Sequence, residues 1–166
     1  MTQDETGLAG RIVEFLRARK IRFCIIGDQG VNAYAEPLVS LDLDIAVSAA
    51  DLGRLEKTLP NAFDVERFEH SLNVSDPGSA LRIQFQTDPR YFDFVERASS
   101  RTVLGIDLPV ASLEDVFQGK VWAALDATRR PSKRQKDLTD IARLLEGHPR
   151  LRTLTPPEIL DKLEKA

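Results

Sequence analysis

Two neighbouring stretches decide the fold: FCIIGDQGVNAY at residues 23–34 and SLDLDIAV at residues 40–47. The first begins within a short apolar run over 21–26, which is typical of a buried strand, stops at Gly27 and continues into a helix-compatible segment over 30–35. The second alternates apolar and acidic residues, which predicts another strand over 41–47. Because a strand that ends at a glycine before a helical segment leaves backbone N–H groups free, the junction predicts a phosphate-binding turn.

The second strand carries the acidic pair Asp42 and Asp44. Side chains two residues apart project to the same side of a strand, roughly 6–7 Å apart. Two adjacent carboxylates repel each other, so a buried strand that keeps both needs a cation or an exposed edge. Mg²⁺ is the natural partner, because it accepts carboxylate oxygens and completes its shell with water and substrate phosphates. The pair alone leaves a second interpretation open, in which both acids are solvated on a polar strand face. Together with the turn at Gly27, it gives the layout that a magnesium nucleotide needs.

Length and composition are those of an ordinary soluble protein. The chain has 166 residues, which predicts a single domain over 1–166, and a formal net charge of −3, which argues against a generally basic surface for nucleic acid. One cysteine and two histidines cannot form a Cys/His zinc cluster, so any metal is expected on oxygen ligands. We find no apolar run of the roughly 20 residues that span a bilayer, and residues 1–6 are polar and acidic. A cytoplasmic protein with no membrane partner is therefore expected.

The remaining pattern predicts strands and helices first, then helices only. Helices are expected over 7–19, 49–59, 91–98 and 112–128, with a break at Pro131, and then around 138–145 and from about 156. Short strands are expected at 63–68, 72–74, 81–85 and within 103–110. This order predicts an α+β fold, with a mixed sheet and flanking helices over about 8–110 and a helical C-terminal part over about 112–166.

The sequence resembles the nucleotidyltransferase superfamily, and specifically the small proteins similar to the AbiEii-type nucleotidyltransferase toxins of bacterial abortive-infection and toxin–antitoxin systems. The resemblance covers most of residues 8–146 and rests on the segments 23–34, 40–45, 81–85, 119–123 and 136–141. It implies a nucleotidyltransferase-like sheet, Mg²⁺ as cofactor and a nucleoside triphosphate as substrate. It also implies transfer of a nucleotidyl group to a hydroxyl of RNA, protein or a small molecule, and a cognate antitoxin as partner.

The resemblance assigns roles to particular residues. It makes Asp42 and Asp44 the metal ligands and Lys120 the lysine that neutralises the triphosphate, and it places phosphate contacts at Gly27, Asp28, Gln29, Gly30 and Ser40. For Lys120, a solvent-facing position on an amphipathic helix is an equal alternative.

Two further groups near the C-terminal helices have open interpretations. Asp137 and Asp140 share a helix face and resemble the acidic motif of the family, but salt bridges to Arg130, Lys133 and Lys136 are the favoured alternative. The basic cluster around Pro131 could meet triphosphate or an RNA acceptor, although a solvated loop is favoured for its members Arg129, Arg130, Lys133, Arg134 and Lys136.

The chain departs from the family pattern at three places. Asp28 follows Gly27 where relatives carry Gly-Gly or Gly-Ser, and residues 38–39 are Leu-Val where many relatives carry an arginine. Gln84 stands where the third catalytic carboxylate is expected, and an amide cannot act as a base at neutral pH. The nearby acids that could replace it are Asp76, Asp88 and Asp93. Two functions follow: a magnesium-dependent nucleotidyltransferase, or a catalytically impaired module that binds a nucleotide or a protein partner.

Overall fold

A mixed sheet forms the centre of the molecule. The computed structural model describes the backbone of residues 3–164 and the side chains of residues 7–163. Within this range seven strands form one sheet in the order β3-β4-β5-β2-β1-β7-β6. The strands are β1 (Phe23–Ile26), β2 (Asp42–Val47), β3 (Asp64–Arg67), β4 (Ser71–Ser75), β5 (Arg82–Gln86), β6 (Ser99–Val103) and β7 (Ile106–Val110). β2 runs antiparallel to β1 and parallel to β5, so the expected mixed sheet and α+β class are confirmed.

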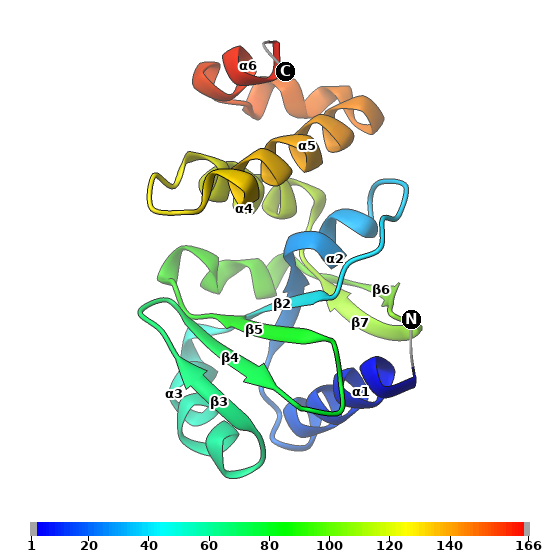
Figure 1. Cartoon of the computed structure of the whole chain (residues 1–166), viewed down its shortest axis with the longest axis vertical. Helices are drawn as coiled ribbons and strands as arrows, with labels where there is room; N and C mark the ends of the chain where they lie inside the picture. Colours follow the sequence, from blue (N-terminus) through cyan, green and yellow to red (C-terminus); the bar gives the residue numbers. More distant parts are fainter. Residues whose placement is uncertain (1–2, 165–166) are drawn as a thin grey trace.

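The helices lie on both sides of this sheet and at one end of it (Figure 1). The α-helices are α1 (Gln3–Ala18), α2 (Gly27–Asn32), α3 (Ala49–Thr58), α4 (Leu113–Leu125), α5 (Pro131–Gly147) and α6 (Pro157–Glu164), and three 3₁₀ segments cover Leu59–Asn61, Pro89–Arg97 and Pro149–Leu154. Helices α4, α5 and α6 follow the last strand and stack together, as expected for a helical C-terminal part (Figure 1). None of the helices described between residues 3 and 164 is both long and apolar enough to cross a membrane.

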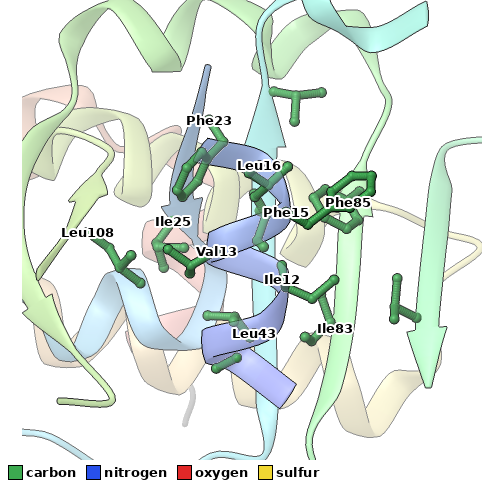
Figure 2. Packing of buried hydrophobic residues seen from close by; sticks show 14 of the residues in the cluster. Ile12, Val13, Phe15, Leu16, Phe23, Ile25, Leu43, Ile83, Phe85 and Leu108 are labelled. Atoms are coloured by element: carbon green, nitrogen blue, oxygen red, sulfur yellow. The ribbon is translucent and has the colours of Figure 1, made fainter. Parts of the chain in front are cut away.

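One face of the sheet packs on α1. Leu43 of β2 and Ile83 and Phe85 of β5 are almost completely buried in one cluster with Ile12 and other residues of α1 (Figure 2). Burying each such side chain contributes about 1.5–3 kcal/mol to folding. The apolar residues of both strands occupy alternate positions, because successive side chains of a strand point to opposite faces.

The other face of the sheet contributes to a second cluster, which joins it to the C-terminal helices. Cys24 of β1 and Ala46 of β2 belong to this cluster with Phe117 of α4 and Ile141 of α5. The ring of Trp122 stacks on Phe94 at 5.8 Å between centroids, which makes these aromatic residues part of the packing. The helical part is therefore held against the sheet by apolar contacts.

Three boundaries differ from expectation for local reasons. Helix α2 begins at Gly27 and not near residue 30, because Gly27 adopts a φ of +64° that turns the chain directly out of β1. The helix expected over 91–98 is a 3₁₀ segment over Pro89–Arg97. Helix α4 ends at Leu125, and Pro131 begins α5, because the first turn of a helix does not need the N–H that proline lacks.

Candidate functional site

A cavity of about 450 Å³ lies between the polar face of the sheet and helices α4 and α5. It brings together seven of the residues predicted from the sequence, namely Gly27, Asp28, Asp42, Asp44, Gln84, Lys120 and Asp137. The other four predicted residues do not line it, namely Gln29, Gly30, Ser40 and Asp140. Gln29 is buried and donates a hydrogen bond to the backbone oxygen of Ser40 at 3.2 Å, and Gly30 packs against Val116, so both hold α2 in place.

The turn at Gly27 touches the acidic pair directly. Ile26, the last residue of β1, is paired with Asp44 of β2. A Cβ atom at Gly27 would lie 2.1 Å from the Oδ2 atom of Asp44. Glycine is therefore required here twice, by its positive φ and by the close approach of the carboxylate.

Asp42 and Asp44 face the cavity in different electrostatic environments. The Oδ1 atom of Asp42 accepts a hydrogen bond from Nε of Arg82 at 2.7 Å, and its own N–H donates to Ser40 Oγ at 3.2 Å. Burial raises the pKa of Asp44 to about 7, with further upward contributions from the negative charges of Asp28 and Asp42 and an opposing one from Lys120. Asp44 is half-buried, so its surroundings differ from those of an acid on a fully solvated strand face.

The two carboxylates fit a hard divalent cation. A cation beside Asp44 would offset the burial that raises the pKa of this carboxyl, and Mg²⁺ prefers such oxygen donors. Between residues 7 and 163, no group of three or more His, Cys, Asp or Glu side chains is arranged to hold a metal ion. A metal at this pair would therefore take its other ligands from water and substrate phosphates.

Lys120 is buried, so the alternative of a solvent-facing position is wrong and the lysine faces the cavity. Its side chain is 7% exposed, and its Nζ atom lies 2.8 Å from Asp28, 2.9 Å from Asp140 and 3.2 Å from Asp137. Burial acts to lower the pKa of Lys120, but these three carboxylates outweigh it and hold the pKa above its ordinary value. The lysine is therefore a fixed positive charge at the wall of the cavity.

Asp28, the departure from the family pattern, is bound by the cations of the site. Its Oδ1 atom accepts hydrogen bonds from Lys120 at 2.8 Å and from Lys136 at 2.9 Å, and its Oδ2 atom accepts one from Ser40 Oγ at 2.9 Å. Although burial opposes it, Lys120 in particular holds the pKa of Asp28 below its ordinary value. A carboxylate of the protein thus already accepts hydrogen bonds from both lysines.

Asp137 and Asp140 connect α5 to α4 through ion pairs. Asp137 contacts Lys120 and Nε of Arg129, the latter at 2.8 Å, and Asp140 contacts Lys120, Lys136 and Arg143. The expected pairing with Lys136 is confirmed for Asp140. The further partners are Arg129 and Arg143, in place of the expected Arg130 and Lys133. Of the basic cluster, the residues that line the cavity are Arg129, Lys133 and Lys136.

Gln84 lies where the sequence predicted it, beside the acidic pair. It is the register partner of Asp44 on the neighbouring strand β5. The three acids considered as its replacement do not line the cavity: Asp76 pairs with Arg11, Asp88 pairs with Arg90, and Asp93 borders a different hollow.

Sequence reasoning missed several polar residues that line the cavity, among them Asn73 of β4 and Glu66 of β3. Asn73 and Glu66 lie in the segment 61–79, where the hydrophobic pattern is weak. These two residues reach the cavity because of the register in which β3 pairs with β4 and β4 pairs with β5. No short-range motif in the sequence predicts that register.

The fold is that of nucleotidyltransferases. The chain is similar to the antibiotic-resistance factor ANT(2'')-Ia, with a TM-score of 0.60, 13% identity and coverage of 98% of this chain and 90% of that one. It is also similar to the lincosamide antibiotic adenylyltransferase LnuA, solved with lincomycin, with a TM-score of 0.54, 12% identity and coverage of 87% and 98%. An antigenic nucleotidyltransferase-like protein from Paracoccidioides brasiliensis matches with a TM-score of 0.56, 14% identity and coverage of 87% and 77%.

The family follows from the sequence match. Residues 39–165 match the family described as nucleotidyl transferase AbiEii toxin, type IV TA system. The chain therefore belongs to the AbiEii nucleotidyltransferase toxin family, as the resemblance predicted. The match contains Asp42, Asp44 and Lys120 and begins after the Gly27 turn. No curated protein matches the chain.

Proposed function

We propose that this protein is a magnesium-dependent nucleotidyltransferase that transfers a nucleotidyl group from a nucleoside triphosphate to a hydroxyl acceptor. The observation that carries the proposal is the meeting, in one cavity, of the Asp42 and Asp44 carboxylates with the basic wall of Lys120, Arg129 and Lys136. Because the sheet and the helical part each contribute one side of this cavity, we infer that residues 1–166 work as a single domain.

The charges around the cavity support a requirement for metal. The side chains that line the cavity include six carboxylates, of Asp28, Asp42, Asp44, Glu66, Asp115 and Asp137, and five cations, of Arg82, Lys120, Arg129, Lys133 and Lys136. Because these cations do not exceed the carboxylates, a triphosphate needs additional positive charge to bind here. Asp42 and Asp44 would hold Mg²⁺, which supplies charge neutralisation and Lewis acidity toward phosphate oxygens when bound.

The residues of this chain would act mainly by positioning and electrostatics. The missing Cβ of Gly27 lets the Asp44 carboxylate lie directly against the turn, where the backbone N–H groups of the turn would meet a phosphate, and Gln29, Gly30 and Ser40 support this turn. Lys120 and Lys136 would neutralise the charge that develops on the leaving pyrophosphate. Gln84 can orient an acceptor hydroxyl by hydrogen bonding but cannot remove its proton.

A second function is supported by two observations. Gln84, an amide, lies beside Asp44 where the resemblance to the family implies a carboxylate, and Asp28 binds Lys120 and Lys136. Both favour a catalytically impaired module that binds a nucleotide or a protein partner. In a type IV toxin–antitoxin family, the expected protein partner is a cognate antitoxin. The acceptor of an active enzyme would be RNA, protein or a small molecule.

Label transfer from α-phosphate-labelled nucleoside triphosphates distinguishes these functions. Each triphosphate is incubated with Mg²⁺ and with RNA, protein or small-molecule fractions, and transferred label and released pyrophosphate are both measured. We expect transfer that requires Mg²⁺ and is lost in the Asp42→Asn, Asp44→Asn double variant. The matched control is Asp161→Asn, a change of an exposed acid on α6. Triphosphate binding without turnover would support the impaired module, and absence of both would contradict the proposal.

A further inference from the structure

A row of polar residues crosses the sheet from the acidic pair to the outermost strand. Asp44 of β2 is in register with Gln84 of β5, Gln84 with Asn73 of β4, and Asn73 with Glu66 of β3. Residues paired across strands present their side chains on the same face. All four line the cavity, so the row forms one polar floor that starts beside Asp44.

The side chain of Asn73 has an unsatisfied hydrogen-bond acceptor that faces the cavity floor. Its Oδ1 atom is buried and has no hydrogen-bond partner among the residues that the structure describes. A buried acceptor without a donor costs about 1–3 kcal/mol, and such atoms in native proteins call for a specific explanation. A hydrogen-bond donor brought by a ligand would satisfy this oxygen. Two strand spacings, roughly 10 Å, separate Asn73 from Asp44 along the floor.

The positions of the basic residues indicate which of the two substrates, the nucleoside triphosphate or the acceptor, lies on this floor. In nucleotidyl transfer, the attacking and leaving oxygens lie roughly in line on opposite sides of phosphorus. Lys120 of α4 and Lys136 of α5 are the groups suited to the leaving pyrophosphate, and they come from the helical wall. The acceptor must then approach over β5 and β4, where Gln84 and Asn73 lie.

The charge of the floor restricts the class of acceptor. Gln84 and Asn73 are neutral amides, and the outer end of the row is the carboxylate of Glu66. Arg82, the cation on the same strand as Gln84, is bound to Asp42. We propose that Gln84, Asn73 and Glu66 form the acceptor subsite and that it takes a neutral or cationic small molecule bearing hydroxyl or amine groups. This assignment rests on the proposed function.

Nuclear magnetic resonance titration tests the subsite without requiring turnover. The side-chain amide signals of Asn73 and Gln84 are followed during separate additions of methyl glucoside, glucosamine, glucose 6-phosphate and a short single-stranded RNA. Gln135, an exposed amide on α5, is the reference. We expect the neutral and cationic sugars to shift the Asn73 and Gln84 signals, and the anionic sugar and the RNA to leave them unchanged. Shifts with the RNA alone, or with no probe up to millimolar concentration, would overturn the proposal.

Two variants sharpen the test. Asn73→Leu replaces the unpaired amide by an apolar side chain of similar size, so we expect unfolding stability to be kept or raised and sugar binding to weaken about tenfold. Glu66→Gln should weaken glucosamine binding several-fold and leave methyl glucoside binding unchanged. Unchanged sugar affinity in Asn73→Leu would contradict the assignment. A parallel addition of magnesium nucleoside triphosphate, followed at the Gly27 amide, tests the proposed function by itself, so the two failures are distinguishable.

Discussion

The two faces of strands β2 and β5 differ in composition: one carries buried apolar side chains, and the other carries the polar side chains that line the cavity. On one face, Leu43 and Phe85 are buried against α1 and make contacts that are complete within the folded chain (Figure 2). On the other face, burial raises the pKa of Asp44 to about 7, and Asn73 of β4, two strands away on the same face, has a buried oxygen without a partner among the described residues. The apolar face is thus satisfied by folding alone, whereas the polar face keeps an unpartnered buried oxygen and an acid with a raised pKa, as we expect of a face that takes ligands.

The largest expected effect tests the apolar face. Phe85→Ala should lower the free energy of unfolding by about 3–5 kcal/mol, because it leaves a cavity under α1. Gln84→Ala, one residue away on the opposite face, should cost less than about 1 kcal/mol. Urea unfolding measures both values. Equal losses would remove the distinction between the two faces.

The next effect concerns the point where the polar face meets the Gly27 turn. Gly27→Ala should lower the free energy of unfolding by roughly 2 kcal/mol and weaken nucleotide binding, because its Cβ would meet Asp44 and φ is +64°. Gly53→Ala is the control, since a Cβ at this helical glycine meets nothing within 4 Å and should stabilise the protein slightly. Similar unfolding curves for the Gly27 variant and the wild type would show that the close approach is relaxed in solution.

A smaller effect is expected on the pH dependence of stability, which depends on the ionisation of Asp44. The folded pKa of about 7 lies above the ordinary value of 3.8, so the folded state binds more protons between these values. Stability without metal should therefore fall as the pH rises from about 4 to about 7, and Asp44→Asn should lack this fall. We expect the variant to gain of the order of 2 kcal/mol relative to wild type between pH 5 and pH 8. Parallel pH profiles of wild type and variant would show that Asp44 titrates normally.

The smallest predicted effect concerns Asp28. Asp28→Asn removes the charge that holds Lys120 and Lys136 and keeps the shape of the side chain. Because Lys120 retains Asp137 and Asp140, we expect the fold to persist and the affinity for magnesium nucleoside triphosphate to rise about three- to tenfold. Calorimetry measures the change, with Asp161→Asn as control. A weakened affinity would mean that Asp28 positions the lysines for phosphate.

The features that depend on neighbouring residues could be predicted from the sequence, whereas those that depend on residues far apart in the chain could not. Strand alternation around Asp42 and Asp44 and the glycine at the end of β1 are short-range patterns, so the sheet, the turn and the acidic pair were predictable. The burial of Lys120 was not, because it depends on carboxylates up to 92 positions away in the chain. The periodicity of α4 shows which residues share a face but does not show which face meets the cavity.

The polar floor was beyond prediction for a different reason. Asn73 and Glu66 are placed by the register of β3, β4 and β5, and the segment between residues 61 and 79 has no pattern strong enough to fix it. Pro131 shows a related ambiguity, since a proline either breaks a helix or begins one, and only packing decides which.

The most direct test is whether the polar face of the sheet binds a nucleoside triphosphate. Calorimetry should measure the binding of each of the four nucleoside triphosphates, with and without Mg²⁺, to the wild type and to the Asp42→Asn, Asp44→Asn double variant. We expect at least one triphosphate to bind, and its binding to require both Mg²⁺ and the two aspartates. Equal binding by the double variant, or no binding of any triphosphate to the wild type, would contradict it.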